Sequence, residues 1–205
     1  MRTAATLLSG LFALACHASS PAGPRPASGG PASSAAALAP DLAVARAPYD
    51  SVQVDWKQRL DQPYVYVEAR GSYTRVGLAL QQAFEALRDQ SLEANGPPFA
   101  LYYDDPGRVS ADELRLRACF PVAAPLQPRP PLAFDLLPST TVVYAYVSGP
   151  YPDVPRAYPS LYAFLGKLEW LEDGPVREIY LVDPTTAASW DELVTEIQIP
   201  ARSGL

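Results

Sequence analysis

Residues 65–122 and 143–201 carry the same sequence pattern, and this internal duplication constrains the fold more than any other feature of the chain. Many residues recur at a constant offset of 78 positions. Among them are Val65, Tyr66, Gly71, Tyr73 and Tyr102, which recur as Val143, Tyr144, Gly149, Tyr151 and Tyr180. One inserted residue then moves the offset to 79, so that Pro121 recurs as Pro200. Two copies are too few for a stacked array, which needs about three units to bury a continuous core, so we expect one domain with two related halves.

Each copy has the same order of expected secondary structure. A segment of alternating character forms a strand, a helix with one apolar stripe follows, and two more strands complete the copy. These elements are expected at residues 64–69, 76–87, 99–104 and 114–122 in the first copy, and at 143–147, 161–171, 177–182 and 193–201 in the second. A further strand precedes each copy, at residues 52–58 and 132–136. The sequence thus predicts an α+β fold, in which duplicated strand–strand–helix–strand–strand units form a curved, mostly antiparallel, eight-stranded sheet with two main helices.

The first 48 residues differ from the rest in composition. Residues 1–15 combine Arg2 with an apolar run too short to span a bilayer, a pattern typical of a signal peptide. Cys16 follows directly, as in the lipidation motif of bacterial lipoproteins, and predicts a lipid anchor; the alternative is ordinary cleavage and a soluble exported protein. Because 25 of the 32 residues 17–48 are Ala, Pro, Ser or Gly, residues 16–48 are expected to form a tether without a core of its own.

Residues 49–205 are then expected to form one folded domain, with its two copies at about 50–122 and 132–201. The predicted location is the bacterial cell envelope. Contact with the membrane is expected only through the lipid on Cys16.

Charge and composition exclude several classes of function. The formal net charge is −6 and no cluster of Lys or Arg occurs, so nucleic-acid binding is not expected. The single histidine, His17, lies in the predicted tether, which leaves the folded domain without histidine-based metal sites or catalytic pairs. The only other cysteine, Cys119, is expected to be a small buried apolar residue. No metal or cofactor is predicted.

Alternation along the strands assigns residues to the two faces of the sheet. Valine and alanine of the first strand in each copy, together with Leu101, Ile179 and Leu181, are expected to face the helices. The opposite face is expected to collect tyrosines and carboxylates, namely Tyr66, Glu68, Tyr102, Tyr144, Tyr146, Glu178 and Tyr180. The alternative is an ordinary half-solvated surface, on which Arg117 neutralises a carboxylate across strands.

Glu178 is the most informative member of this set. Its counterpart in the first copy is Ala100, and a carboxylate present in only one half suits a single bound guest. Aromatic rings attract positive charge by about 0.5–2 kcal/mol, and a carboxylate adds a directed bond. We therefore predict a Tyr/Glu-lined cleft between the halves that binds a small cationic or amphipathic organic molecule. Tyr151 and Trp170 are further candidate wall residues, with helix-packing core as their alternative role.

Several motifs, taken in order, resemble the GyrI-like (gyrase-inhibitor-like) effector-binding domains. They are Gly149-Pro150-Tyr151, Gly174-Pro175, the run from Arg177 to Pro184, Ile199-Pro200, and Tyr102-Tyr103-Asp104-Asp105-Pro106 in the first copy. The resemblance implies a duplicated α/β fold with a central cleft, in which a buried glutamate, here Glu178, recognises lipophilic cations. A histidine often precedes the Gly-Pro-Tyr motif in the family, whereas this chain has Val147 and Ser148. No DNA-reading segment fits before residue 49, so a transcription factor is not expected.

Three functions remain open at this point. The first is a noncatalytic binder of small organic molecules. The second is a hydrolase of small natural products, in which Glu178 acts as general base. The third is a protein-interaction module, in which the tyrosines form a contact patch rather than a cavity.

Overall fold

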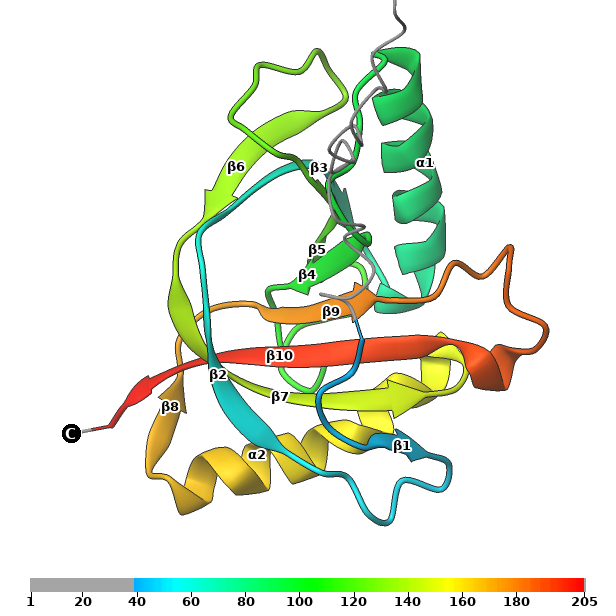
Figure 1. Cartoon of the computed structure of the whole chain (residues 1–205). Coiled ribbons are helices and arrows are strands. Elements are labelled where there is room, and N and C mark those ends of the chain that lie inside the picture. Colours follow the sequence, from blue (N-terminus) through cyan, green and yellow to red (C-terminus); the bar gives the residue numbers. More distant parts are fainter. Residues whose placement is uncertain (1–38, 205) are drawn as a thin grey trace, which may run out of the picture. The chain divides into compact units, whose positions relative to one another are not determined.

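The computed structural model describes residues 39–204, so the predicted signal peptide, Cys16 and most of the predicted tether lie outside the described residues. Within this part of the chain, two α-helices accompany one ten-stranded sheet (Figure 1). The helices are α1 (Val76–Asp89) and α2 (Tyr158–Lys167). The strands are β1 (Val44–Arg46), β2 (Asp55–Arg59), β3 (Gln62–Arg70), β4 (Phe99–Tyr102), β5 (Arg115–Pro121), β6 (Ala133–Leu137), β7 (Thr140–Ser148), β8 (Trp170–Glu172), β9 (Val176–Tyr180) and β10 (Val194–Ser203). Short 3-10 segments are η2 (Tyr73–Arg75), η3 (Tyr151–Ala157) and η4 (Trp190–Glu192).

The two copies meet in the middle of the sheet. The strand order is β1-β7-β10-β9-β4-β5-β3-β6, with β2 also paired to β7 and β8 to β10. Only the β1–β7 pair is parallel, and every other pair is antiparallel. The central pair, β4 and β9, joins the first copy to the second and places Ala100 opposite Glu178. Because these two residues are equivalent at the 78-residue offset, the pseudo-twofold axis passes through this pair.

Each half takes an outer strand from the other copy. Strand β2, which precedes the first copy, pairs with β7 of the second, and β6, which precedes the second copy, pairs with β3 of the first. The two registers are equivalent, because Asp55 pairs with Tyr144 as Ala133 pairs with Tyr66. The exchange interlocks the two halves.

An ion pair holds each exchanged strand, and its polarity is reversed between the halves. Lys57 Nζ of β2 lies 2.8 Å from Glu196 Oε1 of β10. In the other half, Asp135 Oδ2 of β6 lies 2.7 Å from Arg117 Nη1 of β5. If each strand stayed with its own copy, Lys57 would face Arg117 and Asp135 would face Glu196. Like charges would then meet in both halves, so the ion pairs favour the exchanged arrangement.

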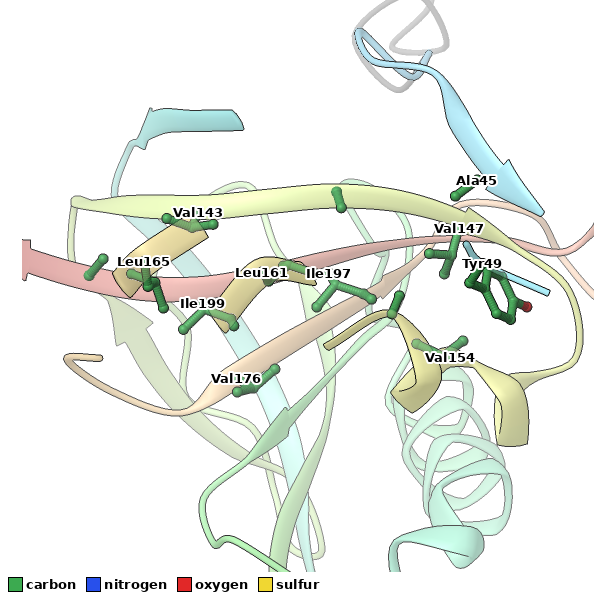
Figure 2. Packing of buried hydrophobic residues seen from close by; sticks show 13 residues of the cluster. Ala45, Tyr49, Val143, Val147, Val154, Leu161, Leu165, Val176, Ile197 and Ile199 are labelled. Carbon is green, nitrogen blue, oxygen red and sulfur yellow. The ribbon is translucent and has the colours of Figure 1, made fainter. Parts of the chain in front are cut away.

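The helices cover one face of the sheet, one in each half. In the first half, Ala79 and Ala83 of α1 pack on Val65 of β3 and on neighbouring strand residues. Figure 2 shows the second half, where Leu161 and Leu165 of α2 lie in one apolar cluster with residues of β7 and β10. Leu161 has no exposed surface, and full burial of a side chain of this size contributes about 1.5–3 kcal/mol. These two cores fix the face on which the helices lie.

The structure confirms the predicted α+β fold, with differences at two places. Strand β1 lies inside the predicted tether, because residues 44–46 pair with β7 and Ala45 is buried in the core of the second half. Strand β8 contains Leu171, which was predicted to be helical; α2 instead ends at Lys167 and the chain turns at Glu169, whose φ is +55°. The sheet therefore has ten strands rather than eight.

Among residues 39–204, no helix has the length and apolar character that crossing a bilayer requires.

Gly149 provides a test of how the N-terminal part of the fold is held. Its φ is +143°, and an added Cβ would lie 2.5 Å from Tyr49 Oη, which donates a hydrogen bond to the carbonyl oxygen of Ser148 at 3.1 Å. We expect Gly149→Ala to lower the free energy of unfolding by about 1–3 kcal/mol in urea denaturation. The control is Gly77→Ala in α1, where nothing lies within 4 Å of an added Cβ. That change should stabilise by about 0.5–1 kcal/mol, and equal effects at both glycines would contradict the expectation.

Candidate functional site

Glu178 lies on β9, at the pseudo-twofold axis between the two helices. It pairs across the sheet with Ala100 of β4 and Ile197 of β10. Ile197 belongs to the core under α2, so Glu178 points to the face that the helices cover. Only 4% of Glu178 is exposed. Ala100 has only a methyl side chain, so the space on the axis can be occupied by the carboxylate of Glu178 alone.

Three phenol groups surround the carboxylate. Tyr158 of α2 donates a short hydrogen bond of 2.5 Å to Oε1 of Glu178. The hydroxyls of Tyr102 and Tyr180 each lie 3.1 Å from Oε2 and 2.9 Å from each other. Tyr102 and Tyr180 are repeat equivalents, so they approach the axis from opposite sides.

The triangle of oxygens formed by Glu178 Oε2, Tyr102 Oη and Tyr180 Oη has a consequence for protonation. Each of the three oxygen–oxygen contacts needs one hydrogen to be a hydrogen bond, but the two phenol hydroxyls supply only two hydrogens. If Glu178 is ionised, one of the three contacts therefore has no hydrogen between its oxygens. A proton on Oε2 supplies the missing one, so the geometry is fully satisfied by a neutral carboxylic acid.

The electrostatic environment acts in the same direction. Burial raises the pKa of Glu178, although the hydrogen bonds from the three phenols oppose this shift. Burial, followed by the charge of Glu178, raises the pKa of Tyr158 well above its ordinary value. Among residues 39–204 no cationic side chain forms an ion pair with Glu178. The site thus holds a buried acidic group without a positive partner.

Two further tyrosines complete the aromatic surroundings. The ring of Tyr73 in η2 lies 4.7 Å from that of Tyr102, and the ring of Tyr151 in η3 lies 4.8 Å from that of Tyr180. Tyr73 and Tyr151 are again repeat equivalents. The duplication therefore places two pairs of steeply inclined rings, one from each copy, around one asymmetric carboxylate.

The structure separates the residues that the sequence predicted to share one face. Tyr102, Glu178 and Tyr180 lie on the helix side, whereas Leu101 and Ile179 lie on the other side in a separate cluster. The remaining predicted members lie on that other side as well and are not part of the Glu178 site; they are Tyr66, Glu68, Tyr144 and Tyr146. The face prediction was therefore wrong for the central strands β4 and β9. Alternation fixes which residues of one strand share a face, but relating two strands also requires their register.

The residues on the other face have partners of their own. Arg117 lies with its Cζ 4.0 Å from the centre of the Tyr66 ring and its Nε 3.6 Å from Glu68 Oε2. Lys57 Nζ lies 3.9 Å from the centre of the Tyr144 ring and donates to the hydroxyl of Tyr146 at 3.4 Å. Because Tyr144 and Tyr146 are buried, they do not form the exposed contact patch that an interaction module would need.

Trp170 is also remote from the site. It lies in β8, and its ring meets that of Trp56 edge to face at 5.8 Å, beside the core of the second half. Tyr158, by contrast, was missed. Its repeat equivalent is Leu80, so the duplication gives no signal for Tyr158. Tyr158 donates to Glu178 because it lies at the start of a helix next to the axis. Tyr73 had a signal, as the repeat equivalent of Tyr151.

The predicted open cleft is filled by these tyrosine side chains at Glu178. Two hollows of the described surface lie elsewhere, one beside α1 and residues 129–131 and one on the sheet face opposite Glu178.

Cys119 is free and fully buried, as predicted. No group of three or more His, Cys, Asp or Glu side chains suited to a metal ion occurs within residues 39–204.

Comparison with protein families identifies the class of domain. The family model of the GyrI-like small molecule binding domain matches residues 53–202. This chain belongs to that family. The matched range contains Glu178, its three phenol partners and both helices.

Solved structures share the fold at low sequence identity. The C-terminal domain of EcmrR is 19% identical, with 74% of this chain and 98% of that chain covered and a TM-score of 0.62. A hydrolase encoded by lin2189 from Listeria innocua is 11% identical, with 73% and 92% covered and a TM-score of 0.54. SAV2435, solved with bound tetraphenylphosphonium, is 13% identical, with 73% and 94% covered and a TM-score of 0.54. The match spans 58% of the EcmrR chain in an EcmrR–DNA complex. No curated protein matches the sequence significantly.

The raised pKa of Glu178 predicts how stability depends on pH. Above about pH 4 the unfolded chain loses the proton of the Glu178 carboxyl, whereas the folded protein keeps it. The free energy of unfolding therefore falls as the pH rises toward the pKa of Glu178 in the folded state. Glu178→Gln has no such proton, so its stability does not fall for this reason. We expect Glu178→Gln to be more stable than the wild type at pH 7 by about 1–3 kcal/mol, and the difference to shrink at pH 4.

Urea denaturation at a series of pH values measures this difference. The control is Glu93→Gln, because Glu93 is exposed and its substitution should change little at either pH. A Glu178→Gln variant that is less stable than the wild type at pH 7 would mean that the phenols stabilise the carboxylate more than burial destabilises it.

Proposed function

We propose that this GyrI-like domain binds small, cationic or amphipathic organic molecules, with the carboxylate of Glu178 as the counter-charge. The observation that carries the proposal is a buried acidic group with three phenol partners and no cation among the described residues. A buried charge without a partner is unfavourable, and a guest with a positive charge would relieve it. The aromatic rings of Tyr73, Tyr102, Tyr151 and Tyr180 would then face the guest.

The fold relatives support this class of ligand. Tetraphenylphosphonium, which SAV2435 binds, is a lipophilic cation with aromatic arms. Phenol rings and one carboxylate are suited to such a molecule, because the rings contact its apolar arms and the carboxylate faces its charge.

A guest reaches Glu178 only if tyrosine side chains move, because the residue is nearly unexposed. Tyr102 and Tyr180 lie on central strands, whereas Tyr151 lies on the short segment η3 and Tyr158 on the first turn of α2. We expect η3 and the start of α2 to move aside when a guest binds. Such a guest would take the place of the Tyr158 hydroxyl next to Oε1.

We further propose that the domain acts at the bacterial cell envelope. The support is the signal-like pattern of residues 1–15, the following Cys16 as a lipid acceptor, and the Ala/Pro-rich residues 17–48. Strand β1 shortens the predicted tether, because residues 44–46 belong to the sheet.

A hydrolase is the second candidate, because burial raises the pKa of Glu178 toward the range that suits a general base at neutral pH. Relatives of the same fold include a protein described as a hydrolase. In this case Glu178→Gln would abolish turnover and retain binding of the substrate. In a receptor, the same change would weaken cation binding without affecting any reaction.

Titration with tetraphenylphosphonium tests the receptor proposal. Charge-assisted bonds contribute about 1.5–3 kcal/mol, so Glu178→Gln should raise the Kd for this cation about 10- to 100-fold in isothermal titration calorimetry. Affinity of the wild type should rise with pH, because the cation favours the ionised carboxylate and releases its proton. Triphenylphosphine oxide, a neutral analogue, should bind both proteins equally.

A pair of tyrosine variants serves as the matched control. Tyr158→Phe removes a phenol that contacts Glu178, whereas Tyr162→Phe removes an exposed phenol one turn later that contacts Glu172. Only the first should alter affinity for the cation. Equal cation affinity of the wild type and Glu178→Gln would refute the assigned role of Glu178.

A further inference from the structure

A second polar site lies on the face of the sheet opposite Glu178. It is a hollow of about 270 Å³ between β2, β9, β10 and the loop at residues 95–97. Arg59, Gln62, Arg177 and Gln198 line it, together with apolar side chains that include Ile179 and Leu181. Arg177 and Ile179 flank Glu178 in β9, so their side chains point to the opposite face of the sheet from the Glu178 carboxylate.

Arg177 is the central residue of this hollow. Only 4% of it is exposed, and its guanidinium Cζ lies 4.0 Å from the centre of the Phe99 ring. Nη2 donates to Oε1 of Gln62, while Nε is buried without a hydrogen-bond partner. No carboxylate of residues 39–204 forms an ion pair with Arg177. Burial, followed by the charge of Arg59, lowers the pKa of Arg177 to about 9.

The groups next to Arg177 leave its charge uncompensated. Arg59 is half-buried, donates through Nη2 to the carbonyl oxygen of Pro138 at 2.9 Å, and has a buried Nε without a partner. Gln198 is 4% exposed and its Oε1 is also without a partner. Glu196, which also lines the hollow, is already paired with Lys57 at 2.8 Å. Two guanidinium groups therefore share one hollow, and neither forms an ion pair with a carboxylate of residues 39–204.

Comparison of the two copies shows that the fold does not require these polar groups. The repeat equivalents of Arg177, Arg59 and Gln198 are Phe99, Leu137 and Cys119, which are all apolar and buried in the first half. Three positions that are satisfied by apolar residues in one half thus carry polar or charged residues in the other, and all three line the same hollow. A structural role would be served as well by the apolar set, because unpaired buried charges destabilise a fold.

We propose that this hollow binds a small organic anion through a single carboxylate group, held by Arg177 and Arg59. The planar guanidinium fork matches a carboxylate, and the apolar side chains beside it accommodate a short apolar body. The charge balance favours one negative charge: Lys57, Arg59 and Arg177 line the hollow with two acids, Asp41 and Glu196, which leaves a surplus of one positive charge. A doubly charged phosphate exceeds that surplus.

Benzoate is the probe for this site, measured by isothermal titration calorimetry and by the shift of the thermal midpoint. We expect saturable binding to the wild type, and at least about a tenfold rise in Kd in Arg177→Met, since a charge-assisted bond is lost. Arg88→Met, which removes an exposed arginine of α1, should bind benzoate as the wild type does. Without benzoate, the thermal midpoint of Arg177→Met should equal or exceed that of the wild type, because an unpaired buried charge has been removed.

Two further variants and inorganic phosphate test the same hollow. Should Arg177→Met fail to fold, Arg59→Gln at the half-buried partner is expected to weaken benzoate binding in the same way. Glu178→Gln should bind benzoate normally, since it lies on the opposite face. The proposal is overturned if benzoate does not bind the wild type up to about 10 mM, if Arg177→Met and Arg59→Gln both bind it unchanged, or if inorganic phosphate binds more tightly than benzoate.

Discussion

The pairing of β4 with β9 is the constraint on which the site depends. These antiparallel strands are equivalent parts of the two copies, and their register places Ala100 and Glu178 opposite each other on the pseudo-twofold axis. Tyr102 and Tyr180 then approach the axis from both sides, and their hydroxyls meet at 2.9 Å. A glutamate in both copies would place two buried carboxylates at the same point, where they repel each other. Alanine in one copy is therefore what allows a single buried acid to occupy the centre.

The exchange of outer strands keeps this centre in place. Because β2 and β6 each pair with the other copy, the two halves cannot separate at β4 and β9 without breaking pairs elsewhere in the sheet. The reversed polarity of the Lys57–Glu196 and Asp135–Arg117 pairs matters here, since two identical copies would give no preference between exchanged and unexchanged strands. Divergence of the copies thus selects one topology out of two that the duplication alone permits.

Much of the fold could be predicted from the sequence, because the repeat doubles every periodic signal and the glycine–proline stops recur at fixed positions. Glu178 could also be singled out, since its counterpart is Ala100. The grouping of Tyr66, Tyr144 and Tyr146 with it could not succeed, because strand alternation contains no information on register between strands. Tyr158 and the pairing of residues 44–46 depend on tertiary contacts that leave no periodic trace in so short a segment.

Arg177 and Glu178 show how a duplicated domain can acquire binding sites without losing its fold. Adjacent residues of a strand point to opposite faces, so the two groups do not pair with each other, and neither has an ion-pair partner among residues 39–204. Their equivalents, Phe99 and Ala100, show that the same strand position folds well when it is apolar on both faces. Stability of the central strands can rest on the apolar copy while the charged copy is free to recognise ligands. On this argument, departures from the repeat that place charge in the interior are the positions to test first for function.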